Sequence, residues 1–227
     1  MPSAEGGTTA QPGPSAEAGS VADPGAVAGI LLAAGQGSRL GRPKALVEIG
    51  GESLARRGVA LLRDGGAAPI VVVTGAVAVD LPGVLAVHNP DWHSGMGSSL
   101  AAGLAIVPDA CAAAVIALVD QPLIGPDAVR RLIVAHAAGA SVAVAAYQGA
   151  PRNPVLLARE HWAEVVALAA GGDAGARPFL RAHPELVTLV ECGDTGRPDD
   201  LDTRSDLDRL AGLVPPLPPH GAPASQD

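Results

Sequence analysis

Strand-like apolar runs alternate along this chain with helix-like stretches. The run at 70–73 is short and wholly apolar, as expected when helices cover both faces of a sheet. The pattern predicts strands at 27–34, 70–73, 84–87, 113–119, 141–147, 155–157 and 186–190, with a loop at 148–154. It predicts a helix from a Ser53 cap to about residue 64, others at about 99–107, 126–138, 159–169 and 174–182, and a last short helix capped by Ser205. This alternation is typical of an α/β protein with a mostly parallel sheet.

The two ends of the chain differ in composition from the part between them. Residues 1–26 are Gly, Pro, Ala, Ser and Glu with almost no large apolar side chain, so we expect a disordered tail. Residues 214–227 are rich in proline and predict a second loose tail. The start lacks the pattern of a signal peptide, and no apolar run is long enough to span a membrane. One domain over 27–213 is therefore expected.

Composition limits the core and the partners. Hydrophobic residues make up 48% but aromatic residues only 2%, so the core must be packed mainly with Ala, Val, Leu and Ile. The net charge of −8 argues against nucleic acid as a partner, and an anionic ligand then needs a local positive patch or a metal. Cys111 and Cys192 lie far apart in the chain, and we expect both to be buried thiols in a reducing cytoplasm.

The stretch from Ile30 to Lys44 begins as an apolar strand and then breaks into glycines and basic residues. Glycines let backbone N–H groups approach a bound group, and successive N–H groups form a concave anion site. Lys44 is the only lysine of the chain, and its compact charge suits a phosphate oxygen. We interpret the stretch as a triphosphate cradle. The alternative is an ordinary strand-to-helix turn.

The glycine spacing excludes two common nucleotide motifs. A dinucleotide fingerprint requires G-x-G-x-x-G and a Walker loop requires G-x-x-x-x-G-K-[ST], whereas Gly41 is followed here by Arg-Pro-Lys. The pattern L-A-A-G-x-G-x-R-x-G-x-P-K instead resembles the signature of the MobA-like nucleotidyltransferases, which are related to molybdenum cofactor enzymes. The resemblance covers about 27–212. It implies a three-layer Rossmann-like nucleotidyltransferase fold with a mostly parallel sheet.

The resemblance also implies where the nucleotide binds and which residues act. The catalytic residues that it implies are Lys44, Arg39 and Asp120. The nucleotide-binding residues implied are Leu32, Ala33, Ala34, Gly35, Gly37, Ser38, Arg39, Lys44, Gly97, Ser99 and Asp120. In related cytidylyltransferases the residue that matches Ser99 meets the cytosine. From the residues alone, Ser98 or Ser99 is equally the cap of a helix.

Two aspartates are candidates for a metal site. Asp120 ends an apolar strand, where an ionised carboxylate is costly unless it is paired or bound to metal. The matching aspartate of molybdopterin cytidylyltransferases holds Mg²⁺, and Asp202 matches a second metal-binding aspartate of the superfamily, with Asp200 as its neighbour. Mg²⁺ prefers oxygen ligands and commonly takes one or two carboxylates plus phosphates. The alternatives are a helix cap or salt bridge for Asp120 and a solvated acidic turn for Asp202.

Two further features concern specificity. Ala33-Ala34 is similar to cytidylyl-transferring relatives, whereas guanylyl-transferring ones typically have Gly-Gly, so the resemblance favours CTP. Residues implied to face the acceptor are Gln121, Asn153 and Arg177. Many cytidylyltransferases have Gly-His-Pro where this chain has Arg152-Asn-Pro, which leaves the acceptor open.

The resemblance implies Mg²⁺-dependent transfer of CMP from CTP to a phosphorylated acceptor such as molybdopterin, with release of pyrophosphate. The partners implied are a nucleoside triphosphate, a small phosphorylated acceptor and a transient protein partner that receives the product, with neither nucleic acid nor membrane. Some relatives bear the name nicotine blue oxidoreductase, so an oxidoreductase that uses a nicotinamide cofactor is the first alternative. A nucleotide-binding module without turnover is the second.

Overall fold

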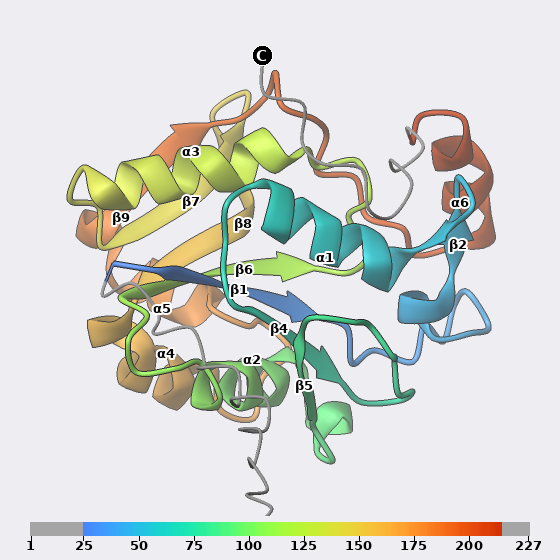
Figure 1. The fold of residues 1–227 in the computed structure, drawn as a ribbon, viewed down its shortest axis with the longest axis horizontal. Coiled ribbons are helices and arrows are strands. Elements are labelled where there is room, and N and C mark those ends of the chain that lie inside the picture. The colour runs from blue at the N-terminus through green and yellow to red at the C-terminus, as the bar shows by residue number, and fades with distance from the viewer. Residues whose placement is uncertain (1–24, 215–227) are drawn as a thin grey trace, which may run out of the picture.

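The computed structural model describes residues 25–214, and a seven-stranded sheet runs through their centre (Figure 1). The strand order is β5-β4-β1-β6-β8-β7-β9. Only β8 runs antiparallel to its neighbours β6 and β7, so the prediction of a mostly parallel sheet is confirmed. The strands are β1 (Val27–Leu32), β4 (Ile70–Thr74), β5 (Leu85–His88), β6 (Ala113–Leu118), β7 (Val142–Tyr147), β8 (Ala150–Ala158) and β9 (Val187–Glu191).

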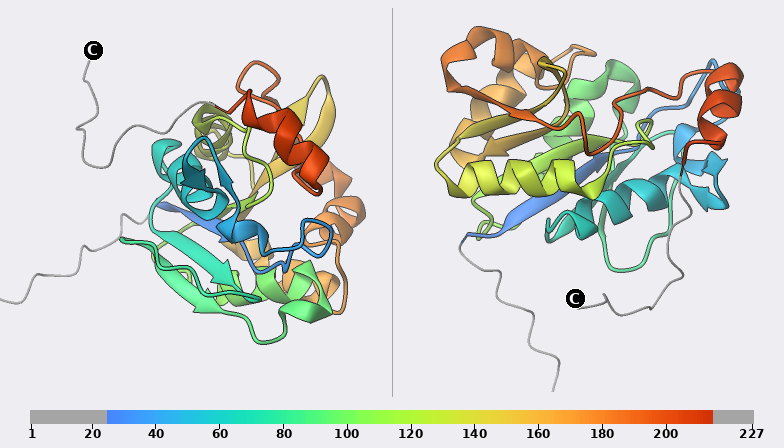
Figure 2. Two further views of the ribbon diagram at one scale, coloured as in Figure 1. Left: turned by 90° about the vertical axis from the view of Figure 1, so that its right-hand side faces the viewer. Right: turned by 90° about the horizontal axis from the view of Figure 1, so that it is seen from above.

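Helices cover both faces of the sheet (Figures 1 and 2). One face carries α1 (Leu54–Asp64) and α3 (Pro126–Ala137), and the other carries α2 (Met96–Ala105), α4 (Trp162–Ala169) and α5 (Arg177–Ala182). Beyond the carboxyl ends of the parallel strands, α6 (Arg204–Ala211) lies near a small hairpin of β2 (Glu48–Ile49) and β3 (Glu52–Ser53) (Figure 1). Four 3₁₀ turns complete the described chain: η1 (Lys44–Leu46), η2 (Trp92–Ser94), η3 (Arg159–His161) and η4 (Pro184–Leu186).

Close approach of the two helix layers holds β1 in place. Successive residues of this strand face opposite layers, with Leu31 in one core cluster and Ile30 in the other, each fully buried. A Cβ atom at Gly58 of α1 would lie 2.5 Å from Leu31, and one at Gly103 of α2 would lie 2.8 Å from Ile30. Because glycine lets both helices pack tightly, a core nearly free of aromatic residues still closes around β1. The loop that follows β1 therefore starts from a fixed point.

Three local predictions were wrong. The predicted loop at 148–154 is a two-residue turn, because Gln148 and Gly149 both have positive φ (55° and 77°) and β8 already begins at Ala150. Helix α2 begins at Met96 rather than near Ser99, so neither Ser98 nor Ser99 is its cap. The cap of α6 is Thr203 rather than Ser205, through a capping box with Asp206.

The predicted tails lie almost wholly outside the described residues. At their inner ends, the Ala26 carbonyl accepts a hydrogen bond from Ala112, and Val214 is 8% exposed within the core, so the packed chain extends slightly past 27–213 at both ends. Cys111 and Cys192 are buried and free, as predicted. Among the described residues, no helix has the length and apolar character needed to cross a membrane.

Candidate active site

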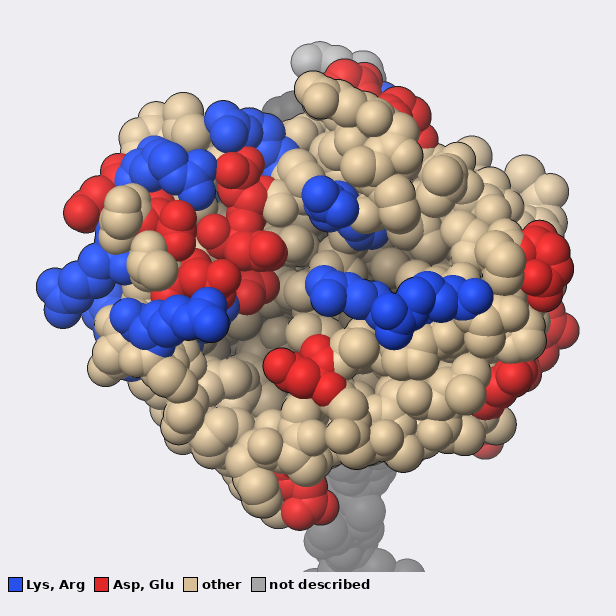
Figure 3. Space-filling view, turned by 180° about the vertical axis from the view of Figure 1, so that it is seen from behind, with Lys and Arg blue, Asp and Glu red and all other residues tan. Residues whose placement is uncertain are grey.

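The sheet has its topological switch point between β1 and β6. From β1 the chain proceeds to β4 and β5 on one side, whereas β6 lies on the other side of β1. Ligands of open α/β sheets bind at the carboxyl ends of the strands beside such a point. The loop at 33–44 leaves the end of β1, and Asp120 follows the end of β6. On the face shown in Figure 3, Lys and Arg side chains border a hollow, with Asp and Glu side chains gathered beside it.

Three of the predicted residues converge at the carboxyl end of the sheet, beside the switch point. The Lys44 ammonium lies 2.7 Å from Oδ2 of Asp120 and 2.5 Å from Oδ1 of Asp202, although these residues are 76 and 158 positions away in the chain. The lysine side chain is 16% exposed. Burial works against its charge, but the two carboxylates outweigh it and raise the pKa of Lys44 above its ordinary value. The lone lysine thus bridges two carboxylates at the switch point.

The two carboxylates fit a magnesium site that relies on its substrate for further ligands. Oδ1 of Asp120 is buried and has no hydrogen-bond partner among the described residues, so one oxygen remains to coordinate a cation. No group of three or more His, Cys, Asp or Glu side chains in the described part could hold a metal. Asp120 and Asp202 would therefore supply two oxygen ligands, and Mg²⁺ commonly takes the rest from phosphates and water.

The segment that carries Asp202 is held against Asp120 by its neighbours. Gln121 is 5% exposed and its Nε2 donates to Oδ1 of Asp200 over 2.9 Å, while the Leu201 amide donates to the Asp120 carbonyl over 2.8 Å. Burial raises the pKa of Asp200, the Gln121 hydrogen bond opposes this, and the neighbouring aspartates add to the increase. The Gln121 amide nitrogen is thus engaged in positioning this segment, and its contact with an acceptor stays a prediction.

The glycine-rich loop combines one structural glycine with one that faces open space. Gly37 has φ of 63°, and a Cβ there would collide with the Arg42 carbonyl oxygen. A Cβ at Gly35 would meet nothing within 4 Å. The Arg39 side chain is exposed, and no ion pair joins it to any described residue. The remaining predicted residues of the loop are placed as follows: Leu32, Ala33 and Ala34 are buried, and the exposed Ser38 accepts a hydrogen bond from Gln36.

The second loop is organised by Asn89, which sequence reasoning did not single out. Asn89 is 4% exposed, and its Nδ2 donates to the hydroxyls of Ser98 and Ser99 at 2.9 and 3.0 Å. Ser99 is itself 4% exposed, so its contact with a base stays a prediction. Gly97 is buried, its amide donates to the Gly172 carbonyl, and a Cβ there would collide with the Ala169 carbonyl oxygen. The Asn89-Pro90 pair directly after β5 was the sequence signal that could have indicated the role of Asn89 in this loop.

Two of the three predicted acceptor residues share a cleft. Asn153 and Arg177 line it together with the predicted nucleotide residue Leu32, between the sheet and helices α2 and α5. The rest of the lining is mostly apolar, and Arg177 is exposed. Gln121 lies apart from this cleft, beside the aspartates.

The fold and the switch-point site define the chain as an α/β protein of the nucleotidyltransferase class. Residues 29–187 match the model of the MobA-like NTP transferase domain, and the chain belongs to that family. The resemblance seen in the sequence and the three-layer fold are thereby confirmed.

Relatives within this family carry different names. The chain is 41% identical over 202 residues to nicotine blue oxidoreductase of Paenarthrobacter nicotinovorans, covering 81% of this chain and 96% of that protein. A shorter match of 48 residues is 50% identical to a protein named probable molybdenum cofactor guanylyltransferase of Opitutus terrae, covering 21% and 24% of the two chains. The crystal structure of Rv0371c from Mycobacterium tuberculosis H37Rv has a TM-score of 0.72 and 26% identity, covering 83% and 99%. A further structure of Rv0371c is a complex with manganese.

Proposed function

We propose that this chain transfers CMP from CTP to the phosphate of a small acceptor, with Mg²⁺ as cofactor and pyrophosphate as the leaving group. The observation that carries the proposal is the bridge of Lys44 between Asp120 and Asp202 at the switch point, beside a glycine-rich loop. Membership in the MobA-like family supports nucleotidyl transfer as the class of reaction.

In this reaction an oxygen of the acceptor phosphate attacks the α-phosphorus of CTP. The new O–P bond forms as the bond from the α-phosphorus to the α–β bridging oxygen breaks, and pyrophosphate leaves with that electron pair. An acceptor phosphate is largely ionised near neutral pH, so no strong general base is needed. Positioning and neutralisation of charge then carry most of the catalysis.

Each part of the site has a role in that scheme. The backbone N–H groups at Gly35 and Gly37 approach the triphosphate, and Arg39 and Lys44 offset its charge. Asp120 and Asp202 would hold Mg²⁺, which supplies charge neutralisation and orientation of the phosphates. Moving from the carboxylates to a phosphate costs the Lys44 ammonium little, because one set of anionic oxygens replaces another.

The preference for CTP is supported by the buried Ala33-Ala34 pair at the end of β1. A methyl group at close backbone approach changes pocket size, although such discrimination is modest, of about 10- to 200-fold per methylene-sized difference. Asn153 and Arg177 are the proposed acceptor contacts, and molybdopterin is the type of acceptor. A cytoplasmic location and a transient protein partner for the product belong to the same proposal.

A nicotinamide-dependent oxidoreductase is the second candidate. The observation that favours it is the 41% identity with nicotine blue oxidoreductase over nearly the whole of that protein. The glycine spacing at 35–41 does not provide the dinucleotide fingerprint. The lysine and the two aspartates have no evident use in hydride transfer, so we place nucleotidyl transfer first.

Binding titrations separate the two candidates. CTP, GTP, NADH and NADPH are titrated into the full chain by calorimetry, each with and without MgCl₂, and Asp202→Asn serves as the variant that removes one proposed metal ligand. We expect Mg²⁺-dependent CTP binding that weakens in Asp202→Asn, followed by pyrophosphate release when a phosphorylated acceptor is present. Binding of NAD(P)H without any nucleoside triphosphate binding would refute nucleotidyl transfer. Mg²⁺-dependent binding with no pyrophosphate release from any phosphorylated acceptor would instead indicate a binding module.

A further inference from the structure

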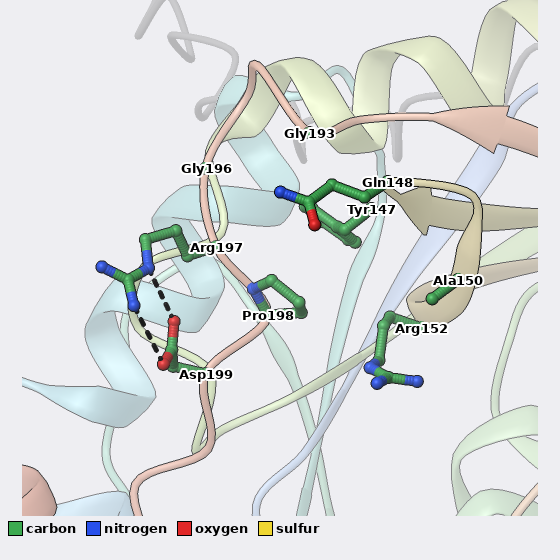
Figure 4. Close-up of a pocket in the computed structure, with 9 residues that line it drawn as sticks. All are labelled: Tyr147, Gln148, Ala150, Arg152, Gly193, Gly196, Arg197, Pro198 and Asp199. Carbon is green, nitrogen blue, oxygen red and sulfur yellow. Dashed lines mark hydrogen bonds and ion pairs between the residues drawn. The ribbon is translucent and has the colours of Figure 1, made fainter.

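A second concave site lies at the carboxyl edge of the sheet, toward the β8-β7-β9 side. It is a pocket of about 250 Å³ between the β7–β8 hairpin and the segment that follows β9 (Figure 4). Gln148 and Arg152 line it from the hairpin, and Arg197 and Asp199 line it from the facing segment. None of these four residues belongs to the site described above.

The two walls of this pocket are tied together by one carboxylate. Glu191, at the end of β9, accepts hydrogen bonds from the backbone amides of Gln148, Gly149 and Gly193 at 3.1, 3.0 and 2.9 Å. The first and strongest of the causes that lower the pKa of Glu191 is the bond from Gly149, followed by the bond from Gly193. A pocket with its walls joined in this way keeps its shape without a ligand, which reduces the entropic cost of binding.

The hairpin tip adopts a conformation that its sequence does not favour. Gln148 is the only described residue other than glycine with a positive φ, at 55°. Two-residue turns of this kind favour Asn, Asp or Gly at that position. Glutamine there costs conformational energy, and it places a long amide side chain on the pocket wall (Figure 4). Such strain commonly accompanies functional positions.

Charge at the pocket favours an anion. Arg197 pairs with Asp199 at 2.9 Å, and Asp199 also pairs with Arg209 at 3.0 Å, so this carboxylate is already shared. Arg152 is exposed, and its one hydrogen bond among the described residues is donated to the neighbouring Pro151 carbonyl. A guanidinium without a carboxylate partner in a concave site suits a carboxylate or a phosphate group.

One chain segment connects the pocket to the lysine–aspartate site. Gly196 forms a bridge with Ile124, and the Arg197 amide donates to the Leu123 carbonyl over 3.0 Å. The segment at 196–202 therefore runs beside the chain that follows Asp120, with the pocket at one end and Asp202 at the other. A small molecule with one phosphate at the aspartates can extend along this segment.

We propose that the pocket binds a second anionic group of the acceptor, remote from the phosphate that reacts. Arg152 is its main contact and Gln148 its hydrogen-bond donor. The inference rests on the proposed nucleotidyl transfer. It replaces molybdopterin, which carries one phosphate and no carboxylate, with an acceptor that has two anionic ends, the second being a carboxylate or a phosphate.

The test uses small probes with one anionic group. Phenyl phosphate, benzoate and the neutral benzyl alcohol are titrated into the full chain, and amide NMR shifts report the binding. We expect an anionic probe to bind and Arg152→Met to weaken it about tenfold, the loss expected for a charge-assisted hydrogen bond. Gln148→Gly should weaken it less while raising Tm, because the strained φ is relieved. The anionic probe with the higher affinity shows whether the second end of the acceptor is a phosphate or a carboxylate.

Two variants serve as controls, one at an arginine outside the pocket and one at the lysine of the first site. Arg63→Met removes an exposed arginine on α1 and should not change probe binding. Lys44→Ala removes the cation of the first site, so it should change the amide shifts that the phosphate probe causes there and leave those of the pocket residues unchanged. The inference is overturned if Arg152→Met binds the probes as the unmodified chain does, if only Lys44→Ala weakens them, or if benzyl alcohol binds equally well.

A parallel CTP titration keeps the two proposals separable. If CTP binds but Arg152→Met leaves the affinity for the probes unchanged, the pocket assignment fails and the proposed function stands. If CTP does not bind while Arg152-dependent probe binding persists, the anion pocket is supported and nucleotidyl transfer fails.

Discussion

Replacement of Lys44 should change metal binding and turnover in opposite directions. In the described structure its ammonium lies 2.7 and 2.5 Å from the two carboxylates proposed to hold Mg²⁺. A divalent cation that binds to these carboxylates without nucleotide must therefore compete with the adjacent positive charge of the ammonium, even where it uses the unpartnered Oδ1 of Asp120. Lys44→Ala removes that competitor and at the same time removes a positive charge proposed to meet the triphosphate.

The contacts set the size of each effect. A hydrogen bond between charged groups contributes about 1.5–3 kcal/mol, so loss of the competitor should tighten Mg²⁺ or Mn²⁺ binding in the absence of nucleotide by about tenfold or more. Loss of a preorganised group that stabilises developing charge typically lowers kcat by about 10²–10³. Asp202 is 44% exposed but Asp120 only 20%, so loss of the lysine should cost the fold about 1–3 kcal/mol, most of it at Asp120.

Calorimetry with MgCl₂ and MnCl₂ measures the first effect, and a pyrophosphate-release assay measures the second. Tm should rise more steeply with metal concentration in Lys44→Ala than in the unmodified chain, because a ligand that binds only the native state stabilises it. Arg39→Ala is the matched control, since it removes a nearby exposed charge that touches neither carboxylate. Equal metal affinity in Lys44→Ala and the unmodified chain, or undiminished pyrophosphate release, would refute the reasoning.

Three further predictions concern the loop, a helix cap and a histidine. Gly35→Ala should leave Tm unchanged but weaken CTP binding, whereas Gly37→Ala should lower Tm because of its positive φ; unchanged CTP affinity in the first variant would contradict the cradle. Thr203→Ala should destabilise the chain by about 1 kcal/mol in urea unfolding and Ser205→Ala by much less, with equal losses arguing against the observed cap. The hydrogen bond that His183 donates to Glu164 of α4 is the largest cause that raises the pKa of His183. Its contribution to stability is then full below the unfolded pKa of about 6.5 and is lost as pH rises through the folded pKa, so the Tm deficit of His183→Gln should shrink between about pH 5.5 and pH 9.

The sequence predicted the sheet well because its signals are local. Short apolar runs such as 70–73 and 113–119 can only be buried strands between helix layers, and the structure places β4 and β6 there. The errors occurred where a tertiary contact decides the geometry. The turn at 148–149 is tight because Glu191, more than forty residues away, binds its amides, and nothing in the local sequence indicates that bond. The Thr203 cap depended on a choice between two hydroxyl residues, Thr203 and Ser205, that lie two positions apart and that the sequence offers equally.

The candidate site shows the same division between local and distant information. The motif located the glycine-rich loop, the end of an apolar strand located Asp120, and the family resemblance located Asp202, because each lies in a segment with its own pattern. The pattern could not show that Gln121 is engaged with Asp200, since that contact joins residues 79 positions apart. Nor did it indicate the arginine-lined pocket, which the hairpin forms with a segment from the far end of the chain.

The presence of a single lysine among the basic residues of the chain links the fold to the proposed chemistry. Where a cation only has to pair with surface acids, this chain uses arginine throughout, as at Arg131 and Arg209. The single exception is Lys44, which pairs with two carboxylates and is proposed to meet a triphosphate as well. A compact ammonium can move between such partners because it has no fixed plane of donors, whereas a guanidinium is suited to one planar partner. Lys44→Arg should therefore keep the two ion pairs and the stability of the chain while losing most of the turnover, and full activity in that variant would show that charge alone is sufficient.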